Sequence, residues 1–351
     1  MSRFFSARLS ALTPYTPGEQ PRERKYIKLN TNESPFPPSP KAIAAAAEAA
    51  ENLQLYSDPT CRALTEQMAA RYGVSPDEVL MTNGSDEVLN FAFMAFCDED
   101  HPALFPDITY GFYKVFAALN RVPYREIPLR EDFSVDLADY QGTSGTIFLA
   151  NPNAPTGLAH APQEIERLLR ANPDRVVVVD EAYVDFGGES CIPLIHKYEN
   201  LLVTGTFSKS RSMAGARLGF GIANAALIRD LDTIKYSTNP YNVNRMTAAA
   251  GLGVLADEDY TEKNCKTIIE NRESAKTVLK NLGFEMTDSL GNFLFIRHPK
   301  KSGEEIYREL RERGILVRHF NQERIKDYNR ITVGTKAEME ALLLALTKIV
   351  R

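Results

Sequence analysis

Residues 206–220 of this chain read TFSKSRSMAGARLGF, and they place Lys209 among hydroxyl-bearing and small side chains. A largely apolar run at residues 201–204 precedes the segment, and Arg217 follows the lysine by eight positions (217 − 209). Such a segment can hold an amine in a pocket beside an anion that the hydroxyl groups and the guanidinium bind. An amine that is desolvated near another cation loses its proton more easily and can then attack carbonyl groups. A surface lysine in a serine-rich loop is the alternative.

Four consecutive valines lead to Asp180 in the sequence VVVVDEAY at residues 176–183. Such a run predicts a buried strand of a parallel sheet that ends at Asp180. In open α/β sheets, ligands bind in the crevice outside the carboxyl ends of the strands, so a carboxylate there would face a ligand. Capping of a turn or helix after the strand is the alternative role for Asp180.

Length and composition limit the classes of protein to consider. The chain has 351 residues, more than one hydrophobic core usually serves, so we expect two domains. A net charge of −5 without a basic block argues against nucleic-acid binding. The four cysteines are scattered without a CxxC pair and only five histidines accompany them, which predicts neither a disulfide framework nor a metal site.

The chain shows no targeting or membrane signal. No segment approaches the ~20 apolar residues of a membrane span. Residues 1–12 are acid-free but lack the apolar run of a secretory signal, and we expect them to form a mobile arm. We therefore expect a cytoplasmic protein without a membrane partner.

Short apolar runs alternate with amphipathic segments between residues 39 and 244. The serine–proline pair at 39–40 predicts the start of a helix over 41–53, and a second helix is expected at about 61–71. The expected strands are residues 79–82, 103–105, 125–128, 146–150, 176–180, 201–204 and 218–223, and the helices between them include 86–97, 111–119 and 162–171. This alternation predicts an α/β fold with a mostly parallel seven-stranded sheet flanked by helices.

The pattern of apolar runs and amphipathic segments changes on either side of residues 39–244. Residues 13–38 are rich in proline and cannot form a regular helix. After residue 244, helical stretches at about 245–256 and 259–282 precede strands at 292–297, 315–317 and 330–333, a helix at 303–313 and a terminal helix from 336. We predict an extended N-terminal arm (1–38), a large ligand-binding domain (39–244), and an interdomain helix with a small C-terminal α+β domain (245–351).

The sequence NGSD at residues 83–86 lies between an expected strand and an expected helix. Free backbone N–H groups and the positive end of the helix dipole favour an anion at such a place. Gly84 allows close backbone approach, and Ser85 adds a hydroxyl group. The segment predicts a phosphate site to which Ser208 and Arg217 would add donors, and an ordinary strand-to-helix turn is the alternative.

The string Ser-Lys followed by Ala-Gly-x-Arg-x-Gly resembles the Schiff-base lysine motif of fold-type I pyridoxal-phosphate (PLP) enzymes. The separation of 29 positions between Asp180 and Lys209 (209 − 180) is similar to that of aminotransferases. The resemblance implies that Lys209 holds PLP in the large domain and transfers protons as general base and acid. It also implies that Asp180 keeps the pyridine nitrogen protonated and that Tyr183 donates to the phenolic oxygen.

The same resemblance implies further cofactor contacts and a dimer. Residues on the loops around the expected phosphate site are implied to bind the cofactor: Gly84, Ser85, Asp86, Thr206, Ser208 and Arg217. Tyr110, in PDITYG (106–111), resembles the aromatic residue that stacks on the cofactor ring. Tyr56, in LYSDP (55–59), resembles the tyrosine that reaches the cofactor phosphate of the other subunit, which predicts a homodimer with shared active sites.

Residues 151–157, NPNAPTG, depart from the family pattern. The family usually has asparagine directly before Pro-Thr-Gly, where it contacts the phenolic oxygen of the cofactor, and this chain has Ala154 there. Either Asn153 takes that role through a shifted backbone, or Tyr183 makes that hydrogen bond alone. The sequence leaves both alternatives open.

Strings near both ends narrow the resemblance. Residues 12–20 (LTPYTPGEQ), 28–35 (KLNTNESP) and 329–335 (NRITVGT) are similar to those of histidinol-phosphate aminotransferases. The implied substrates are a small-molecule amino donor and a 2-oxo acid, here histidinol phosphate and 2-oxoglutarate, in histidine biosynthesis. Arg330 would bind the glutamate carboxylate or the substrate phosphate, and Arg318 the phosphate, because guanidinium groups hold both anions. Tyr15 and Asn32 would line the substrate side.

Three alternative functions remain open. A PLP-dependent decarboxylase of an amino-acid phosphate could use the same lysine, aspartate and arginines. An aromatic amino-acid aminotransferase could share the N-terminal strings. A PLP-binding regulator without turnover would carry a DNA-binding module ahead of the fold, whereas nothing basic precedes the PLP motifs here.

Overall fold

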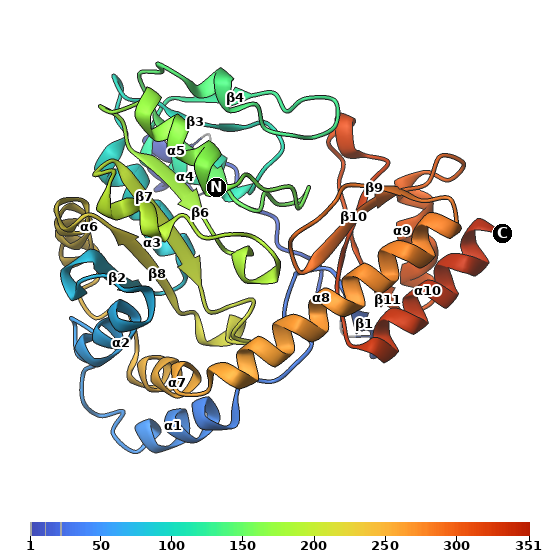
Figure 1. Ribbon diagram of the computed structural model, residues 1–351, viewed down its shortest axis with the longest axis horizontal. Coiled ribbons are helices and arrows are strands. Elements are labelled where there is room, and N and C mark those ends of the chain that lie inside the picture. The colour runs from blue at the N-terminus through green and yellow to red at the C-terminus, as the bar shows by residue number, and fades with distance from the viewer. Residues whose placement is uncertain (1, 11, 22) are drawn as a thin grey trace.

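A seven-stranded sheet lies at the centre of the larger part of the molecule in the computed structural model, which describes residues 2–10, 12–21 and 23–351 (Figure 1). In the order β2-β8-β7-β6-β5-β3-β4, its strands are β2 (Val79–Thr82), β8 (Gly219–Ala223), β7 (Leu201–Thr206), β6 (Val177–Asp180), β5 (Thr146–Ala150), β3 (Ala103–Pro106) and β4 (Tyr124–Ile127). Only β8 runs antiparallel to its neighbours. The predicted α/β class and mostly parallel sheet are confirmed.

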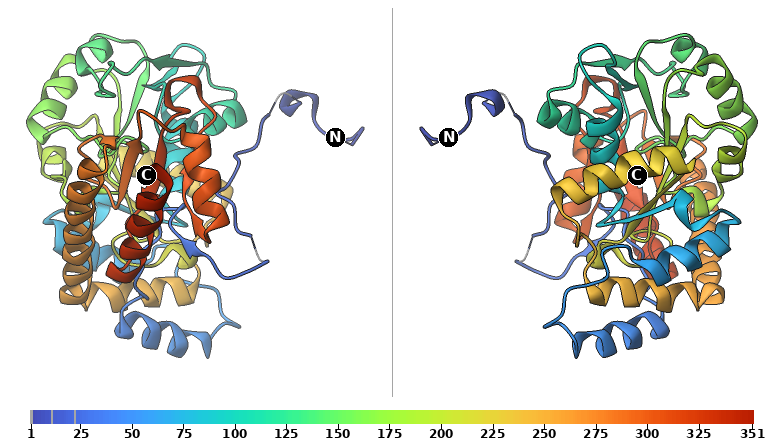
Figure 2. Two further views of the ribbon diagram at one scale, coloured as in Figure 1. Left: turned by 90° about the vertical axis from the view of Figure 1, so that its right-hand side faces the viewer. Right: turned by 90° about the vertical axis from the view of Figure 1, so that its left-hand side faces the viewer.

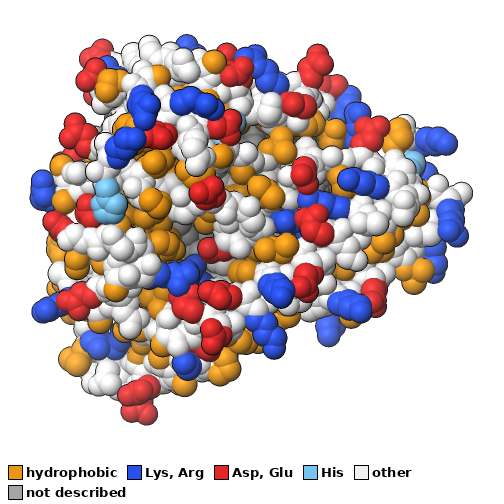
Figure 3. Space-filling view, viewed as in Figure 1, with side chains coloured by type: hydrophobic (Ala, Val, Ile, Leu, Met, Phe, Trp, Pro, Cys, Tyr) orange, Lys and Arg blue, Asp and Glu red, His pale blue; other side chains and the backbone are white. Residues whose placement is uncertain are grey.

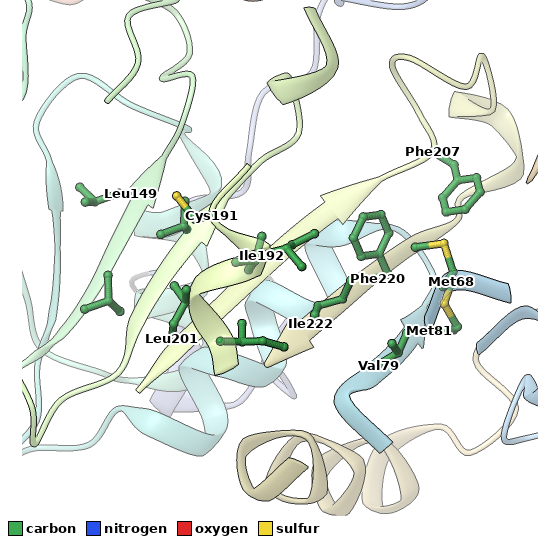
Figure 4. Packing of buried hydrophobic residues seen from close by; sticks show 14 of the residues in the cluster. Met68, Val79, Met81, Leu149, Cys191, Ile192, Leu201, Phe207, Phe220 and Ile222 are labelled. Atoms are coloured by element: carbon green, nitrogen blue, oxygen red, sulfur yellow. The ribbon is translucent and has the colours of Figure 1, made fainter. Parts of the chain in front are cut away.

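Helices cover both faces of this sheet. One face packs against α3 (Ser85–Phe96), α4 (Phe112–Asn120) and α6 (Ala225–Thr238), and the other against α2 (Arg62–Tyr72), α5 (Pro162–Ala171) and α7 (Arg245–Leu255). Val178 belongs to the first cluster, and Val177 and Val179 belong to the second, as the alternation of side chains along a strand requires. Figure 4 shows part of the second cluster, with Phe220 and Ile222 of β8 on the same side as Met81 of β2.

Helix α6 is the one long element of this part that the sequence analysis does not predict. Asn224 caps it, because its side chain accepts a hydrogen bond from the backbone N–H of Ala226. Ile228 and Leu231 then bury one face against the sheet. The asparagine cap followed by apolar residues three positions apart is the signal that could have found it.

The smaller part of the molecule contains a four-stranded antiparallel sheet with the order β12-β13-β10-β9. Its strands are β9 (Glu285–Met286), β10 (Phe293–Arg297), β12 (Arg318–His319) and β13 (Asn329–Thr332), and its helices are α9 (Gly303–Glu312) and α10 (Lys336–Val350). From the N-terminal arm, β1 (Ile27–Lys28) pairs in parallel with β11 (Ile315–Leu316). The long helix α8 (Glu258–Asn281) connects α7 to this part (Figure 1).

Packing changes within residues 245–351, the segment predicted to hold an interdomain helix and a small C-terminal domain. Ala250 and Val254 of α7 belong to the cluster of the large sheet, and a Cβ atom at Gly253 would lie 2.6 Å from the carbonyl oxygen of Lys41 in α1 (Pro40–Ala50). Ile268 and Ala275 of α8 belong to the small-domain cluster. The packing therefore changes one helix after the boundary expected at residue 244.

The N-terminal arm has two parts. Residues 2–10 project away from the body of the molecule, with Phe4 and Phe5 exposed (Figure 2). Residues 12–21 return to it, while residues 1, 11 and 22 of the expected arm lie outside the described residues. The described part of the chain also contains seven 3₁₀ helices: Ala7–Leu9, Pro76–Glu78, Leu137–Tyr140, Val184–Phe186, Ile192–His196, Ala214–Ala216 and Glu323–Ile325.

Acidic and basic side chains are mixed over the face shown in Figure 3. All four cysteines are free thiols, and within residues 2–10, 12–21 and 23–351 no cluster of His, Cys, Asp or Glu could hold a metal ion. None of the helices in these ranges combines the length and apolar character needed to cross a bilayer.

Candidate active site

A cavity of about 330 Å³ lies at the carboxyl ends of β5, β6 and β7 and at the start of α3. We call it the sheet-edge cavity; most of the predicted cofactor residues line it: Ser85, Asp86, Tyr110, Asp180, Tyr183, Thr206, Ser208, Lys209 and Arg217. An arm cavity of about 400 Å³ adjoins it, and Tyr15, Arg318 and Arg330 line that one. Lys209, Tyr110 and Tyr183 line both, so the two cavities meet at the lysine.

Lys209 stands on the loop that follows β7. Its Nζ atom lies 3.3 Å from the carbonyl oxygen of Thr31 and 5.8 Å from the centroid of the Tyr183 ring. Among the described residues, no carboxylate forms an ion pair with it. An amine without a carboxylate partner, at the junction of two cavities, is free to react with a carbonyl compound bound there.

Asp180 ends β6 at the floor of the sheet-edge cavity and is 5% exposed. Its carboxylate accepts hydrogen bonds from the Ala182 N–H (3.2 Å), the Thr204 hydroxyl (3.3 Å) and the Tyr113 hydroxyl (3.4 Å). Burial, with the nearby Asp86 carboxylate, raises the pKa of Asp180 to about 6. Since no described cation pairs with this buried carboxylate, a ligand with a protonated ring nitrogen fits the position.

The predicted phosphate site surrounds the N-terminus of α3. Gly84 precedes the helix with φ +80°, and a Cβ atom at Gly219 would lie 2.3 Å from the backbone nitrogen of Ser85, so the β8 strand passes very close to the loop. Thr206 and Ser208 add hydroxyl groups 2.9 Å apart. The Arg217 guanidinium lies 3.1 Å from Asp86. We call the donors of Ser85, Thr206, Ser208 and Arg217 the anion cradle. Helix dipole, hydroxyl groups and guanidinium together fit a phosphate group.

Two tyrosines form walls of the cavity. The Tyr110 hydroxyl donates to Asp86 (2.6 Å), and burial, followed by this carboxylate, raises the pKa of Tyr110 well above its ordinary value. Tyr183 lies beside the lysine, and its hydroxyl accepts a hydrogen bond from Asn32 Nδ2 (3.0 Å). Tyr113, which the sequence analysis does not single out, supports Asp180 from below; no motif around it indicates this role.

Asn153 is not brought to either cavity. Its side-chain amide donates to the Ile108 carbonyl (3.0 Å) and to Thr156 (3.1 Å) and accepts from Thr109 (2.7 Å). Ala154 lines both cavities instead. Because Thr156 of the turn and Ile108 and Thr109 of the segment after β3 engage the Asn153 amide, the structure provides no shifted backbone that would place it at the cavity.

The two predicted substrate arginines stand opposite each other on neighbouring strands, β12 and β13. Arg330 donates to the Asn30 carbonyl (3.3 Å), its Nε is buried without a partner, and desolvation lowers its pKa. No described carboxylate pairs with it. Arg318 donates to the carbonyls of Thr16 and Pro17 (both 3.4 Å). Arg330 thus has a guanidinium group that could bind an anionic ligand.

The remaining predicted residues are Tyr15, Asn32 and Tyr56, and only Tyr15 lines one of the two cavities. Tyr15 of the arm packs on Phe112 with ring centroids 4.4 Å apart and lines the arm cavity. Asn32 is fully buried and contacts Tyr183 rather than lining a cavity; its neighbours Thr31 and Glu33 line the sheet-edge cavity. Tyr56 is 80% exposed, stacks on Tyr241 at 4.6 Å and lines neither cavity of its own chain.

Comparison with known proteins extends these observations. Residues 24–346 match the family of aminotransferases class I and II. Histidinol-phosphate aminotransferase 1 of Bordetella parapertussis is 49% identical to this chain over 99% of both sequences. The histidinol-phosphate aminotransferase of Chromohalobacter salexigens is 49% identical over 100% of both.

Solved structures share the fold. The histidinol-phosphate aminotransferase from Sinorhizobium meliloti, in complex with pyridoxal-5'-phosphate, has a TM-score of 0.86 at 24% identity and covers 93% of this chain and 92% of its own. L-threonine-O-3-phosphate decarboxylase from Porphyromonas gingivalis has a TM-score of 0.80 at 23% identity, with 92% and 98% covered. The family predicted from the lysine motif is confirmed: this chain belongs to the aminotransferase class I and II family.

Proposed function

We propose that this chain is a PLP-dependent aminotransferase that exchanges an amino group between histidinol phosphate and 2-oxoglutarate. The observation that carries the proposal is the meeting of Lys209, the buried Asp180 carboxylate and the anion cradle at Arg217 in one cavity. The full-length relatives at 49% identity, which bear the name of this activity, support the choice of substrates.

Each part of the sheet-edge cavity suits one part of PLP. Ser85, Thr206, Ser208 and Arg217 would hold the phosphate group, which is an anion at a helix N-terminus. Asp180 would pair with the pyridine nitrogen and keep it protonated. When bound, PLP supplies an electron sink for a carbanion formed next to it. Lys209 would hold the cofactor covalently until the amino donor takes its place.

The freed Lys209 amine would then transfer a proton at the reacting carbon of the substrate, as general base and general acid. Its position at the junction of the two cavities supports this role, since it faces both the cofactor position and the substrate position. Glu33 lines the sheet-edge cavity, and its pKa is lowered by hydrogen bonds from Lys28 and Thr31 against the opposing effect of burial. Glu33 is therefore an anion and not the proton donor.

The arm cavity supports recognition of anionic substrates. Arg330, which has no carboxylate partner among the described residues, would bind the carboxylate of glutamate and the phosphate of histidinol phosphate in turn. Arg318, held by arm carbonyls at the rim, would add a contact to the phosphate. A planar guanidinium holds both groups in a bidentate manner, so one pocket can accept two dissimilar substrates.

The active unit would be a homodimer in the cytoplasm. Exposed apolar side chains lie on and beside the loop of Tyr56: Leu53 and Leu55 of the same loop, and Tyr241, which stacks on Tyr56. A patch of this kind on a protein surface favours a protein partner. Covered by a second copy of the chain, Tyr56 would reach the phosphate group in the partner's cavity.

Borohydride reduction of the PLP-loaded protein, followed by peptide mapping, tests the cofactor assignment. We expect a label on Lys209 and loss of amino transfer in Lys209→Ala, whereas Lys263→Ala, an exposed lysine of α8, should behave as the unaltered protein. A label on another lysine contradicts the assignment. In a substrate panel, release of carbon dioxide from an amino-acid phosphate faster than amino transfer would favour a decarboxylase, and a preference for phenylalanine or tyrosine would favour an aromatic aminotransferase.

A further inference from the structure

We propose that Thr332 positions the hydroxyl group of Tyr183, acting through Asn32, so that the Tyr183 proton points into the sheet-edge cavity. The role of Thr332 rests on the proposed function, because the group that would receive this proton is the phenolic oxygen of PLP. Thr332 and Asn32 are positioning residues here, since neither lines the cavity.

The backbone N–H of Asn32 decides which hydrogen bond the Thr332 hydroxyl accepts and which one it donates. The backbone N–H of Asn32 lies 2.8 Å from Thr332 Oγ1, and an N–H can only donate. The oxygen of Thr332 therefore accepts there. Its single proton is left for the side chain of Asn32, whose Oδ1 lies 3.0 Å away.

This contact decides the orientation of the Asn32 amide. Because the side-chain atom beside Thr332 must accept a proton, it is the oxygen Oδ1, and the nitrogen Nδ2 faces the other way. Nδ2 lies 3.0 Å from the Tyr183 hydroxyl and can only donate to it. The hydroxyl of Tyr183 consequently accepts from Asn32, and its own proton remains for a group on the cavity side.

Burial and backbone conformation keep this chain of hydrogen bonds in place. Asn32 is 0% exposed and Thr332 is 3% exposed, so water does not compete. The backbone of Asn32 has φ +55°, a left-handed conformation that is held by a hydrogen bond from Asn292 Nδ2 to the Asn32 carbonyl (3.0 Å). The backbone N–H of Thr332 donates to Leu29 (2.9 Å), which ties β13 to the same arm segment.

The direction of the Tyr183 proton matters in this chain because a second donor is missing. Ala154 occupies the position where the family pattern has an asparagine, and the amide of Asn153 is engaged by Ile108, Thr109 and Thr156. Tyr110 also lines both cavities, but its hydroxyl donates to Asp86, so Tyr183 is the tyrosine beside Lys209 that can donate to an anionic oxygen. Of the two alternatives left open by the sequence, the geometry favours Tyr183 acting alone.

A donor at the phenolic oxygen has a measurable effect on the linkage between Lys209 and bound PLP. A hydrogen bond donated to that oxygen would favour the form of the linkage that has lost its proton, because the oxygen would then carry an unbalanced negative charge. Tyr183 should therefore lower the pH midpoint of the absorbance change of the bound cofactor. Removal of the donor should raise the midpoint by about one pH unit, since hydrogen bonds to charged groups contribute about that much.

The experiment is a spectrophotometric pH titration of the PLP-loaded protein and of four variants. Tyr183→Phe removes the donor, Thr332→Val keeps the shape of the threonine without its hydroxyl, and Thr332→Ser restores the hydroxyl. The double variant Tyr183→Phe/Thr332→Val tests whether the two residues act in series. Thermal unfolding of the cofactor-free proteins is measured in parallel, and Thr332→Ala replaces Thr332→Val if the valine variant does not fold.

We expect Tyr183→Phe and Thr332→Val to raise the midpoint, Thr332→Ser to leave it near that of the unaltered protein, and the double variant to match Tyr183→Phe. A shift in Tyr183→Phe but not in Thr332→Val, with only the unfolding temperature lowered, would overturn the positioning role. Additive shifts in the double variant would also overturn it. Failure of the unaltered protein to acquire a PLP absorbance band would instead refute the proposed function on which this role rests.

Discussion

Gly84 and Arg217 approach each other so closely that a Cβ atom at position 84 would lie 2.6 Å from Nη2 of the arginine. The two residues are 133 positions apart in the sequence (217 − 84), and they meet because β8 pairs with β2 in antiparallel orientation. The backbone of Gly84 has φ +80°, a conformation that side chains rarely adopt. Its missing side chain leaves room for the guanidinium in the anion cradle.

Gly84→Ala should therefore weaken PLP binding by about tenfold or more, which corresponds to about 1.4 kcal/mol. The added methyl group displaces Arg217 and strains the loop that starts α3. Equilibrium titration of the cofactor-free protein with PLP measures the effect. Gly73→Ala is the matched control, since Gly73 also has a positive φ (+68°) but has nothing within 4 Å of the added atom. Equal affinities in the two variants would contradict the cradle.

Arg330→Ala should reduce kcat/KM for glutamate and for histidinol phosphate alike. The loss of a guanidinium from a partly buried anion pair is expected to cost on the order of 3 kcal/mol. Arg318→Ala, at the rim, should harm the phosphate-bearing substrate more than glutamate. Half-reactions followed at the cofactor absorbance measure each substrate separately. Arg330→Lys, which keeps the charge without the planar fork, should recover only part of the loss, and unchanged half-reactions in Arg330→Ala would exclude this residue from substrate binding.

Chains that carry Lys209→Ala and chains that carry Tyr56→Phe should complement each other when mixed. If Tyr56 serves the partner's phosphate site, each hybrid dimer contains one site with both defects and one intact site. Recovered activity is the expected outcome, with hybrid formation confirmed by mass spectrometry. As a control, the double variant Lys209→Ala/Tyr56→Phe mixed with unaltered chains creates no additional intact site. Hybrids without recovery would mean that Tyr56 does not act across the interface.

Glu181 should make the cofactor-free protein less stable as the pH rises. Burial raises its pKa from 4.5 to about 7, against hydrogen bonds from the Cys191 N–H and the Ser190 hydroxyl (both 2.6 Å). The folded state therefore binds more protons than the unfolded state between these values, and its stability is highest below 4.5 and falls until the pH passes about 7. The expected total loss from this group is about 3 kcal/mol.

Chemical unfolding across this pH range should show that the free energy of unfolding declines less steeply with pH in Glu181→Gln than in the unaltered protein. Asp180, whose pKa is raised to about 6, contributes in the same direction and remains in the variant, so some decline persists. The glutamine loses a hydrogen bond, and for that reason the slope against pH, rather than the absolute stability, is compared. Identical slopes would show that Glu181 titrates as an ordinary carboxyl group.

The sequence by itself determined most of the strands and helices along the chain and the candidate reactive groups. Each of these depends on neighbouring residues: the valine run before Asp180 is buried on both faces, and the serine, lysine and arginine of residues 208–217 form one local motif. The asparagine cap of helix α6, with the apolar residues that follow it, is a local signal of the same kind.

The tertiary structure alone decided how those groups act on one another. Tyr183 and Thr332 lie 151 and 300 positions after Asn32 in the sequence. Only the folding of the N-terminal arm brings the three residues into one chain of hydrogen bonds. The direction of a shared proton, the raised pKa of Asp180 and the missing partner of Arg330 depend on burial and on what lies opposite each group. Local sequence patterns carry no information on burial across such distances, because it arises only when separate segments exclude water together.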